Sequence, residues 1–169
     1  MNYERLIAWA NNIHKKDKKY GLFCAELGIP GMSVMSRTMG YYMPNAPEII
    51  VKQRSVYGTA VGQMCLAEST KGCYLVLDAK YLMDIKLRSC EKKTIDEKEV
   101  PIIFVGNGCF NARYIYEAIT TMGVRVEVYK GGNRNDPLLI CDTEGNMCII
   151  CPANVNDPRC REKWPKDEE

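Results

Sequence analysis

The sequence predicts an α+β protein with two helices and about eight strands. Residues 3–16 repeat apolar side chains at helical spacing, and residues 110–123 form a second helical pattern between a capping asparagine and a glycine. By contrast, VRVEVYK (124–130) alternates apolar and other residues, and residues 136–152 hold two apolar runs around an EGN turn. Such alternation and pairing are typical of strands and of a β-hairpin.

The first helix is predicted over residues 3–16, with Asn2 as its N-cap and a lysine-rich KKDKK segment at its end. Residues 20–47 are rich in glycine, proline and methionine and show no sustained period. We therefore expect a long loop or an insertion there, with one short helix at most. In domain terms, this predicts a single domain over 1–155, an irregular insertion at about 20–50, and a charged tail over 156–169.

The middle of the chain reads mostly as strands. Residues 48–54, 55–68 and 72–79 are rich in residues typical of strands, with a turn at Thr70–Gly72. Residues 80–88 are also predicted to be a strand. CEKKTIDEKE (90–99) is predicted to be a charged loop, and VPIIFVG (100–106) is short and apolar enough for a buried strand. The second helix then begins after Asn111 and ends at Gly123, a residue that tolerates a left-handed cap.

Composition excludes some classes of function. The formal net charge is +2, too small to indicate a strong field for nucleic acid or membrane, so any DNA contact must come from local lysines and arginines. The N-terminal segment resembles neither a signal peptide nor a membrane anchor. We therefore expect a cytoplasmic protein with no membrane partner, whose nine cysteines stay reduced.

The cysteines cluster near the C-terminus, where residues 138–160 contain four, two of them in a CIIC motif. Because this motif lies in a predicted strand, Cys148 and Cys151 should point to opposite faces and could not share one metal. We expect them to be packing residues, and keep a small zinc or thiol-redox module as a less favoured alternative.

Catalytic patterns are equally weak. His14 is the single histidine, no G-x-S-x-G motif occurs, and GNGCFN (106–111) lacks the lysine of a phosphate-binding loop. The sequence therefore predicts no enzyme, no catalytic residue, no metal site and no cofactor.

The order of motifs from Val100 onward resembles the last part of a domain of the bacterial DNA polymerase III sliding clamp (β subunit). The matching residues in the second helix and in the hairpin after it are Asn111, Arg113, Tyr114, Ala118, Ile119, the run Pro137, Leu138, Leu139 and Ile140, and Pro152. Earlier in the chain, Asp78 and Leu82 match the family's A-T-D-G-x-R-L segment, whereas Ala79, Lys80 and Tyr81 depart from it. The resemblance covers residues 56–155.

The resemblance implies a DNA-clamp-like domain, with two helices packed on antiparallel sheets and facing DNA inside a ring. It implies non-specific contacts to duplex DNA through Lys15, Lys16, Lys18, Lys19 and Arg113. Because the chain has room for one such domain, a ring would require a homo-oligomer joined through edge strands.

The resemblance also implies a pocket for replication proteins that carry a short hydrophobic clamp-binding peptide. The matching positions are Lys80, Tyr81 and Leu82 on one segment, and Cys151, Pro152, Ala153 and Val155 on the other. In the family these segments come from neighbouring domains, so a second copy would complete the pocket. The charged tail is expected to be solvated, although Trp164 could cover the pocket.

A second function remains open at this point. A one-domain clamp mimic could bind a replication protein through its edge strands and never encircle DNA. The near-neutral charge and the altered pocket segment favour this protein-interaction module, whereas the family resemblance favours a clamp-like replication accessory protein.

Overall fold

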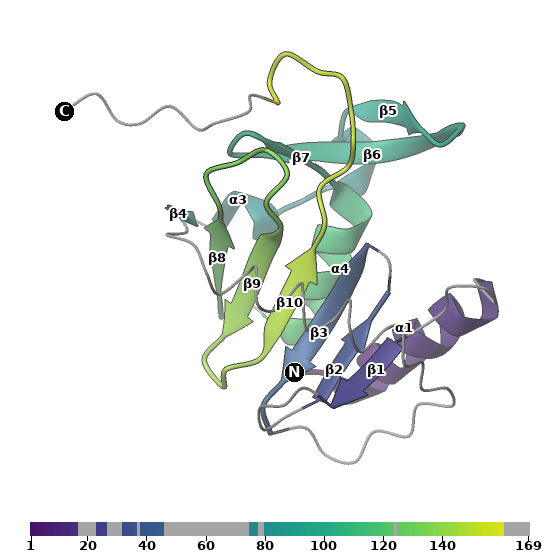
Figure 1. Cartoon of the computed structure of the whole chain (residues 1–169), viewed down its shortest axis with the longest axis vertical. Coiled ribbons are helices and arrows are strands. Elements are labelled where there is room, and N and C mark those ends of the chain that lie inside the picture. Colours follow the sequence, from purple (N-terminus) through teal and green to yellow (C-terminus); the bar gives the residue numbers. More distant parts are fainter. Residues whose placement is uncertain are drawn as a thin grey trace.

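The computed structural model describes residues 1–16, 23–26, 32–36, 38–45, 75–77, 80–123 and 125–160 of the chain (Figure 1). The strands predicted over 48–54 and 55–68 lie outside the described residues, as do Lys18, Lys19 and Trp164. All strand pairs in the described part are antiparallel, and helices accompany them, which confirms the predicted α+β class.

The larger sheet of the described residues has seven strands in the order β1-β2-β3-β10-β9-β8-β4. Their bounds are β1 Phe23–Glu26, β2 Met32–Met35, β3 Met39–Met43, β4 Leu75–Leu77, β8 Val126–Lys130, β9 Leu138–Asp142 and β10 Met147–Ile150. A smaller sheet contains β5 Lys92–Ile95, β6 Lys98–Val105 and β7 Gly108–Asn111. The helical elements are α1 Tyr3–Lys16, α3 Lys80–Met83, the short 3₁₀ helix η1 Leu87–Ser89 and α4 Ala112–Met122.

The large sheet combines two units of the same design, each a helix followed by a three-stranded meander. One unit is α1 with β1, β2 and β3, and the other is α4 with β8, β9 and β10. The last strands of the two meanders, β3 and β10, pair with each other, so the strand order of one unit mirrors that of the other. Both helices cover the same face of this sheet (Figure 1).

Alternating side chains of the sheet divide between two clusters. Ile140, Cys148 and Ile150 face the helices and belong to the main core, together with Leu6 of α1 and Ile115 of α4. Met35, Leu139 and Ile149 form a smaller cluster on the opposite face. The sheet therefore buries apolar side chains on both faces, which explains its near-continuous apolar strands.

The two long helices begin and end where the sequence predicts. The Asn2 side chain accepts a hydrogen bond from the Arg5 backbone N–H at 3.0 Å, and Asn111 accepts one from the Arg113 N–H at 3.0 Å. Gly123 adopts a φ of 103° and donates its N–H to the Ile119 carbonyl at 2.8 Å. These caps satisfy helix-end groups that would otherwise lack partners.

The helices contact each other directly across the layer. The Asn2 backbone N–H donates to the Thr121 carbonyl at 2.7 Å, and the Arg5 guanidinium donates two hydrogen bonds to the Glu117 carboxylate, at 3.1 and 2.9 Å. The start of α1 is thus fixed beside the end of α4.

Three element predictions were wrong. Residues 20–47, predicted to be a long loop or an insertion, contain β1, β2 and β3. Residues 80–88 contain α3 and most of η1 and form no strand. The helical turn of α3 buries Leu82 against the main core, and Met83 and Ile85 are partly buried beside it.

The charged segment 90–99 is not a loop but most of a hairpin. β5 pairs with β6 around a two-residue turn in which Asp96 and Glu97 both have positive φ, at 48° and 64°. Two positive φ values are typical of a type I′ turn, whose twist suits a hairpin. The lysines and glutamates lie on β5 and on the exposed start of β6, which explains why this segment lacks an apolar strand pattern.

Candidate nucleic-acid interface

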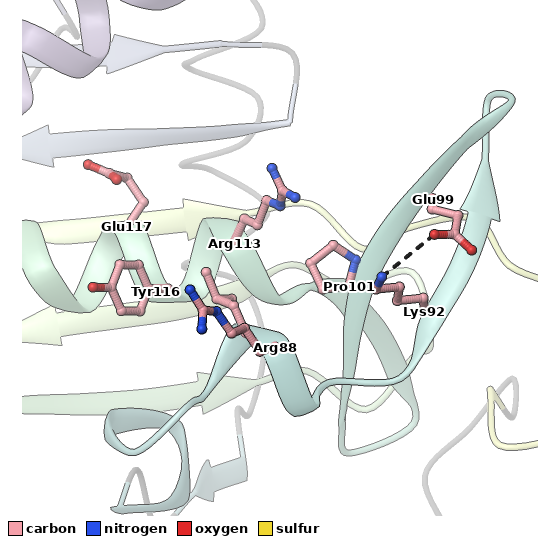
Figure 2. A pocket seen from close by; sticks show the side chains of 8 residues that line it. Arg88, Lys92, Glu99, Pro101, Arg113, Tyr116 and Glu117 are labelled. Carbon is pink, nitrogen blue, oxygen red and sulfur yellow. Dashed lines mark ion pairs between the residues drawn. The ribbon is translucent and has the colours of Figure 1, made fainter.

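A groove of about 580 Å³ lies between α4, η1 and the β5–β6 hairpin (Figure 2). Its walls are Leu87 and Arg88 of η1, Lys92, Glu99 and Pro101 of the hairpin, and Arg113, Tyr116 and Glu117 of α4. Its volume lies in the range of ordinary ligand sites, about 300–1,000 Å³.

The exposed face of α4 forms one side of this groove. Arg113, Tyr116 and Thr120 are exposed and recur three and four residues apart, so they share one helix face, whereas Ile115 and Ile119 point into the core. Tyr116 is 45% exposed, a high value for a tyrosine side chain on a packed helix. The core side of α4 therefore orients an arginine and an aromatic ring toward the groove.

The acidic residues of the groove are already paired. Glu99 forms an ion pair with Lys92 at 3.7 Å across the hairpin, and Glu117 pairs with Arg5 of α1 at 2.9 Å. Arg88 and Arg113 form no ion pair with any residue that the structure describes. Among the described residues, the unneutralised charge of the groove is thus that of two guanidinium groups.

Arg113 also stands in an electrostatically unfavourable place. It occupies the first turn of α4, where the helix dipole is positive, and that turn contains no acidic residue. A bound anion would relieve this repulsion, and guanidinium groups match phosphate oxygens in geometry and charge. The groove is therefore chemically suited to a phosphate group.

The DNA-contact residues predicted from the sequence are only partly placed. Arg113 lies on the exposed face of α4, as described above. Lys15 and Lys16 are the last residues of α1, and their side chains, like Lys18 and Lys19, lie outside the described part. Arg88 was not among the predicted DNA-contact residues, because residues 80–88 were predicted to be a strand. No feature of the sequence indicates that Arg88 lies in the same groove as Arg113.

The predicted peptide-pocket residues occupy two separate settings. In α3, Lys80 and Tyr81 are exposed, but Leu82 is 1% exposed and packs in the main core. Leu82 therefore offers little surface to a peptide in this conformation of the chain.

The second pocket segment follows β10. The Cys151 N–H donates to the Thr38 carbonyl at 2.8 Å, and the Ala153 N–H donates to the Cys109 carbonyl at 2.7 Å. Ala153 and Val155 line a hollow of about 10 Å³, room for one water molecule at most. Pro152 is half-buried beside them. A peptide would need a wider pocket than these residues form within one chain.

The described part of the C-terminal tail is exposed at Pro158 and Arg159 but is held by ion pairs and hydrogen bonds. Arg159 donates two hydrogen bonds to Glu91, both at 2.9 Å, and its guanidinium lies 3.8 Å from the centre of the Phe104 ring. It also binds Asp157, which pairs with Lys93 at 2.9 Å, and hydrogen bonds from Arg159 hold the Asp157 pKa well below its usual range. Residues 157–160 are thereby fixed to the β5–β6 hairpin.

The two cysteines of the CIIC motif have different environments. Cys148 is completely buried in β10, and burial raises the pKa of its thiol well above the usual value. Cys151 follows the end of the strand and is half-buried. Among the residues that the structure describes, no three histidine, cysteine or acidic side chains gather closely enough to hold a metal.

Comparison with protein-family models, curated protein sequences and solved structures gives no match for the chain. In the described ranges, every helix is too short or too polar to cross a membrane.

Proposed function

We propose that this protein is a clamp-like DNA-replication accessory protein, whose helical layer contacts the sugar-phosphate backbone of DNA without sequence preference. In this proposal it also docks replication proteins that carry a hydrophobic clamp-binding peptide. The observation that carries the proposal is the pair Arg88 and Arg113, which have no acidic partner among the described residues and line one groove of that layer.

The arrangement of the helices supports the same proposal. α1 and α4 lie together on one face of the large sheet (Figure 1), the face that sliding clamps turn toward DNA. The strands β1 and β4 end the sheet on either side within the described part of the chain. Free strand edges are sites at which copies of a chain can pair.

Duplex binding tests the proposal. We expect a fluorescently labelled duplex of about 20 base pairs to bind with an affinity that falls steeply as salt rises, because phosphate contacts release counterions. Changing Arg88→Gln and Arg113→Gln together should remove about two contacts and flatten the slope of log K against log salt by about 1.8. Fluorescence anisotropy at several salt concentrations measures this slope.

Arg125→Gln provides the matched control, because Arg125 is exposed just before β8 and does not line the groove. The slope of log K against log salt for this variant should differ from the wild-type slope by no more than about 0.9, the value of one phosphate contact. A double variant whose slope and affinity match the wild type would contradict a role of the groove in DNA binding.

The buried position of Leu82 favours a second function, the non-ring interaction module. With Leu82 in the core, the α3 half of the clamp pocket departs from the family's pattern. A protein that remains monomeric and binds a replication protein, but not duplex DNA, would be such a module.

A further inference from the structure

The groove is concave, and this shape bears on the kind of nucleic acid it fits. One wall is α4 with η1, which carries the two arginines, and the other is the β5–β6 hairpin, which carries Pro101, Lys92 and Glu99 (Figure 2). Duplex DNA is stiff, with a persistence length of about 50 nm, so a short stretch of it can span the rim but cannot bend into the hollow. An unpaired strand is flexible enough to enter.

The side chains of the groove match an unpaired nucleotide more closely than a duplex backbone. Tyr116 presents an exposed ring, and the partly buried Leu87 adds apolar surface on the neighbouring wall. A duplex hides the faces of its bases, whereas single-stranded nucleic acid offers each base for stacking on aromatic side chains and each phosphate to nearby cations. Phosphate contacts alone would give Tyr116 no role.

We propose that this groove binds one nucleotide of an unpaired DNA strand, with its phosphate held by Arg88 and Arg113 and its base stacked on Tyr116. This inference rests on the proposed function for its ligand class, nucleic acid. It assigns the hollow of the groove to an unpaired strand, whereas a duplex reaches Arg88 and Arg113 only from the rim. In a replication setting the site would hold the template or displaced strand beside the duplex.

The experiment compares labelled dT15 with a labelled 15-base-pair duplex by fluorescence anisotropy. Base stacking on an aromatic side chain contributes about 1–3 kcal/mol, so Tyr116→Ala should weaken dT15 binding by about tenfold or more. Tyr116→Phe keeps the ring and should restore wild-type affinity. Duplex affinity should not change in either variant, because a paired base cannot reach the ring.

Thr120→Ala is the matched control, since Thr120 is the next exposed residue on the same face of α4 but does not line the groove. It should bind dT15 like the wild type. Circular dichroism of each variant excludes unfolding as the cause of a weaker signal.

Tyr116→Ala binding dT15 with unchanged affinity, or losing dT15 and duplex equally, would overturn the inference. Displacement of dT15 by a poly-glutamate peptide at equal charge concentration would also overturn it, in favour of an acidic protein partner. The proposed function fails separately, if duplex DNA does not bind while dT15 still depends on Tyr116.

Discussion

Lys130 is a buried lysine whose replacement should destabilise the fold in a pH-dependent way. It is 1% exposed, at the end of β8, and its ammonium group donates to the Asn107 side-chain oxygen at 3.3 Å, the Gly131 carbonyl at 3.0 Å and the Asn133 carbonyl at 2.6 Å. It thereby ties the β6–β7 turn to the loop that follows β8. Its pKa is lowered from 10.5 to about 8, mainly because burial disfavours the charged form.

Lys130→Met removes these hydrogen bonds while keeping most of the apolar stem. The Asn107 oxygen and the Gly131 carbonyl would lose a donor inside the protein, at a cost of about 1–3 kcal/mol for each buried acceptor. Relief from burying a charge offsets part of this cost. We expect the variant to lose about 2–4 kcal/mol of unfolding free energy at pH 7.

The difference should grow as the pH rises. Because the folded-state pKa of Lys130 lies below its unfolded value, the unfolded chain binds more protons between about pH 8 and 10.5. The contribution of Lys130 to stability therefore rises across this window. From the two pKa values, the gap between wild type and Lys130→Met should widen by about 2 kcal/mol between pH 7 and pH 9.5.

Urea unfolding followed by circular dichroism at both pH values measures the gap. Titrating cysteines and tyrosines affect both proteins alike and cancel in the comparison. Lys98→Met is the control, because Lys98 is exposed on β6, and its effect should stay within about 0.5 kcal/mol. A gap that stays constant or narrows at pH 9.5 would contradict a lowered pKa for Lys130 in the folded protein.

Two further predictions concern the packing around the hairpin and the C-terminal segment. Gly108→Ala should lower the unfolding free energy by about 1–3 kcal/mol, because a new Cβ would lie 2.7 Å from the Phe110 ring and 2.8 Å from the Lys130 side chain. Urea unfolding measures this loss. Gly132→Ala is the control and should show no such loss, because no atom lies within 4 Å of a Cβ added there. Asp157→Asn should speed tryptic cleavage after Arg159, because it weakens the charged hydrogen bonds that hold the Arg159 guanidinium. Mass spectrometry of a timed digest measures this, and an unchanged rate at that bond, relative to cleavage after Arg125, would argue against the tether.

The elements that the sequence predicts well are those with local signals. Asn111 and Gly123 mark the ends of α4 by their own side-chain and backbone chemistry, and the turn of the 136–152 hairpin lies between two apolar runs. The β5–β6 hairpin was missed because Asp96 and Glu97 adopt positive φ without the glycine or asparagine that usually announces it.

The groove was less predictable than the elements around it. The resemblance named Arg113 as a DNA contact, but the groove depends on how the hairpin and η1 pack against α4. That packing brings together residues far apart in the chain, and the spacing of apolar residues in the sequence does not predict it. The tether of Arg159 to Glu91, across 68 positions of sequence, escaped prediction for the same reason.

The most direct test of the clamp-like proposal is the mass of the protein in solution, measured by light scattering over a range of concentrations. One chain has a mass of 19.2 kDa and is expected to provide one domain. If the chain keeps the six-domain ring of the sliding-clamp family, we expect a closed oligomer of about six times that mass. A monomer at every concentration tested would contradict the clamp and leave the interaction module.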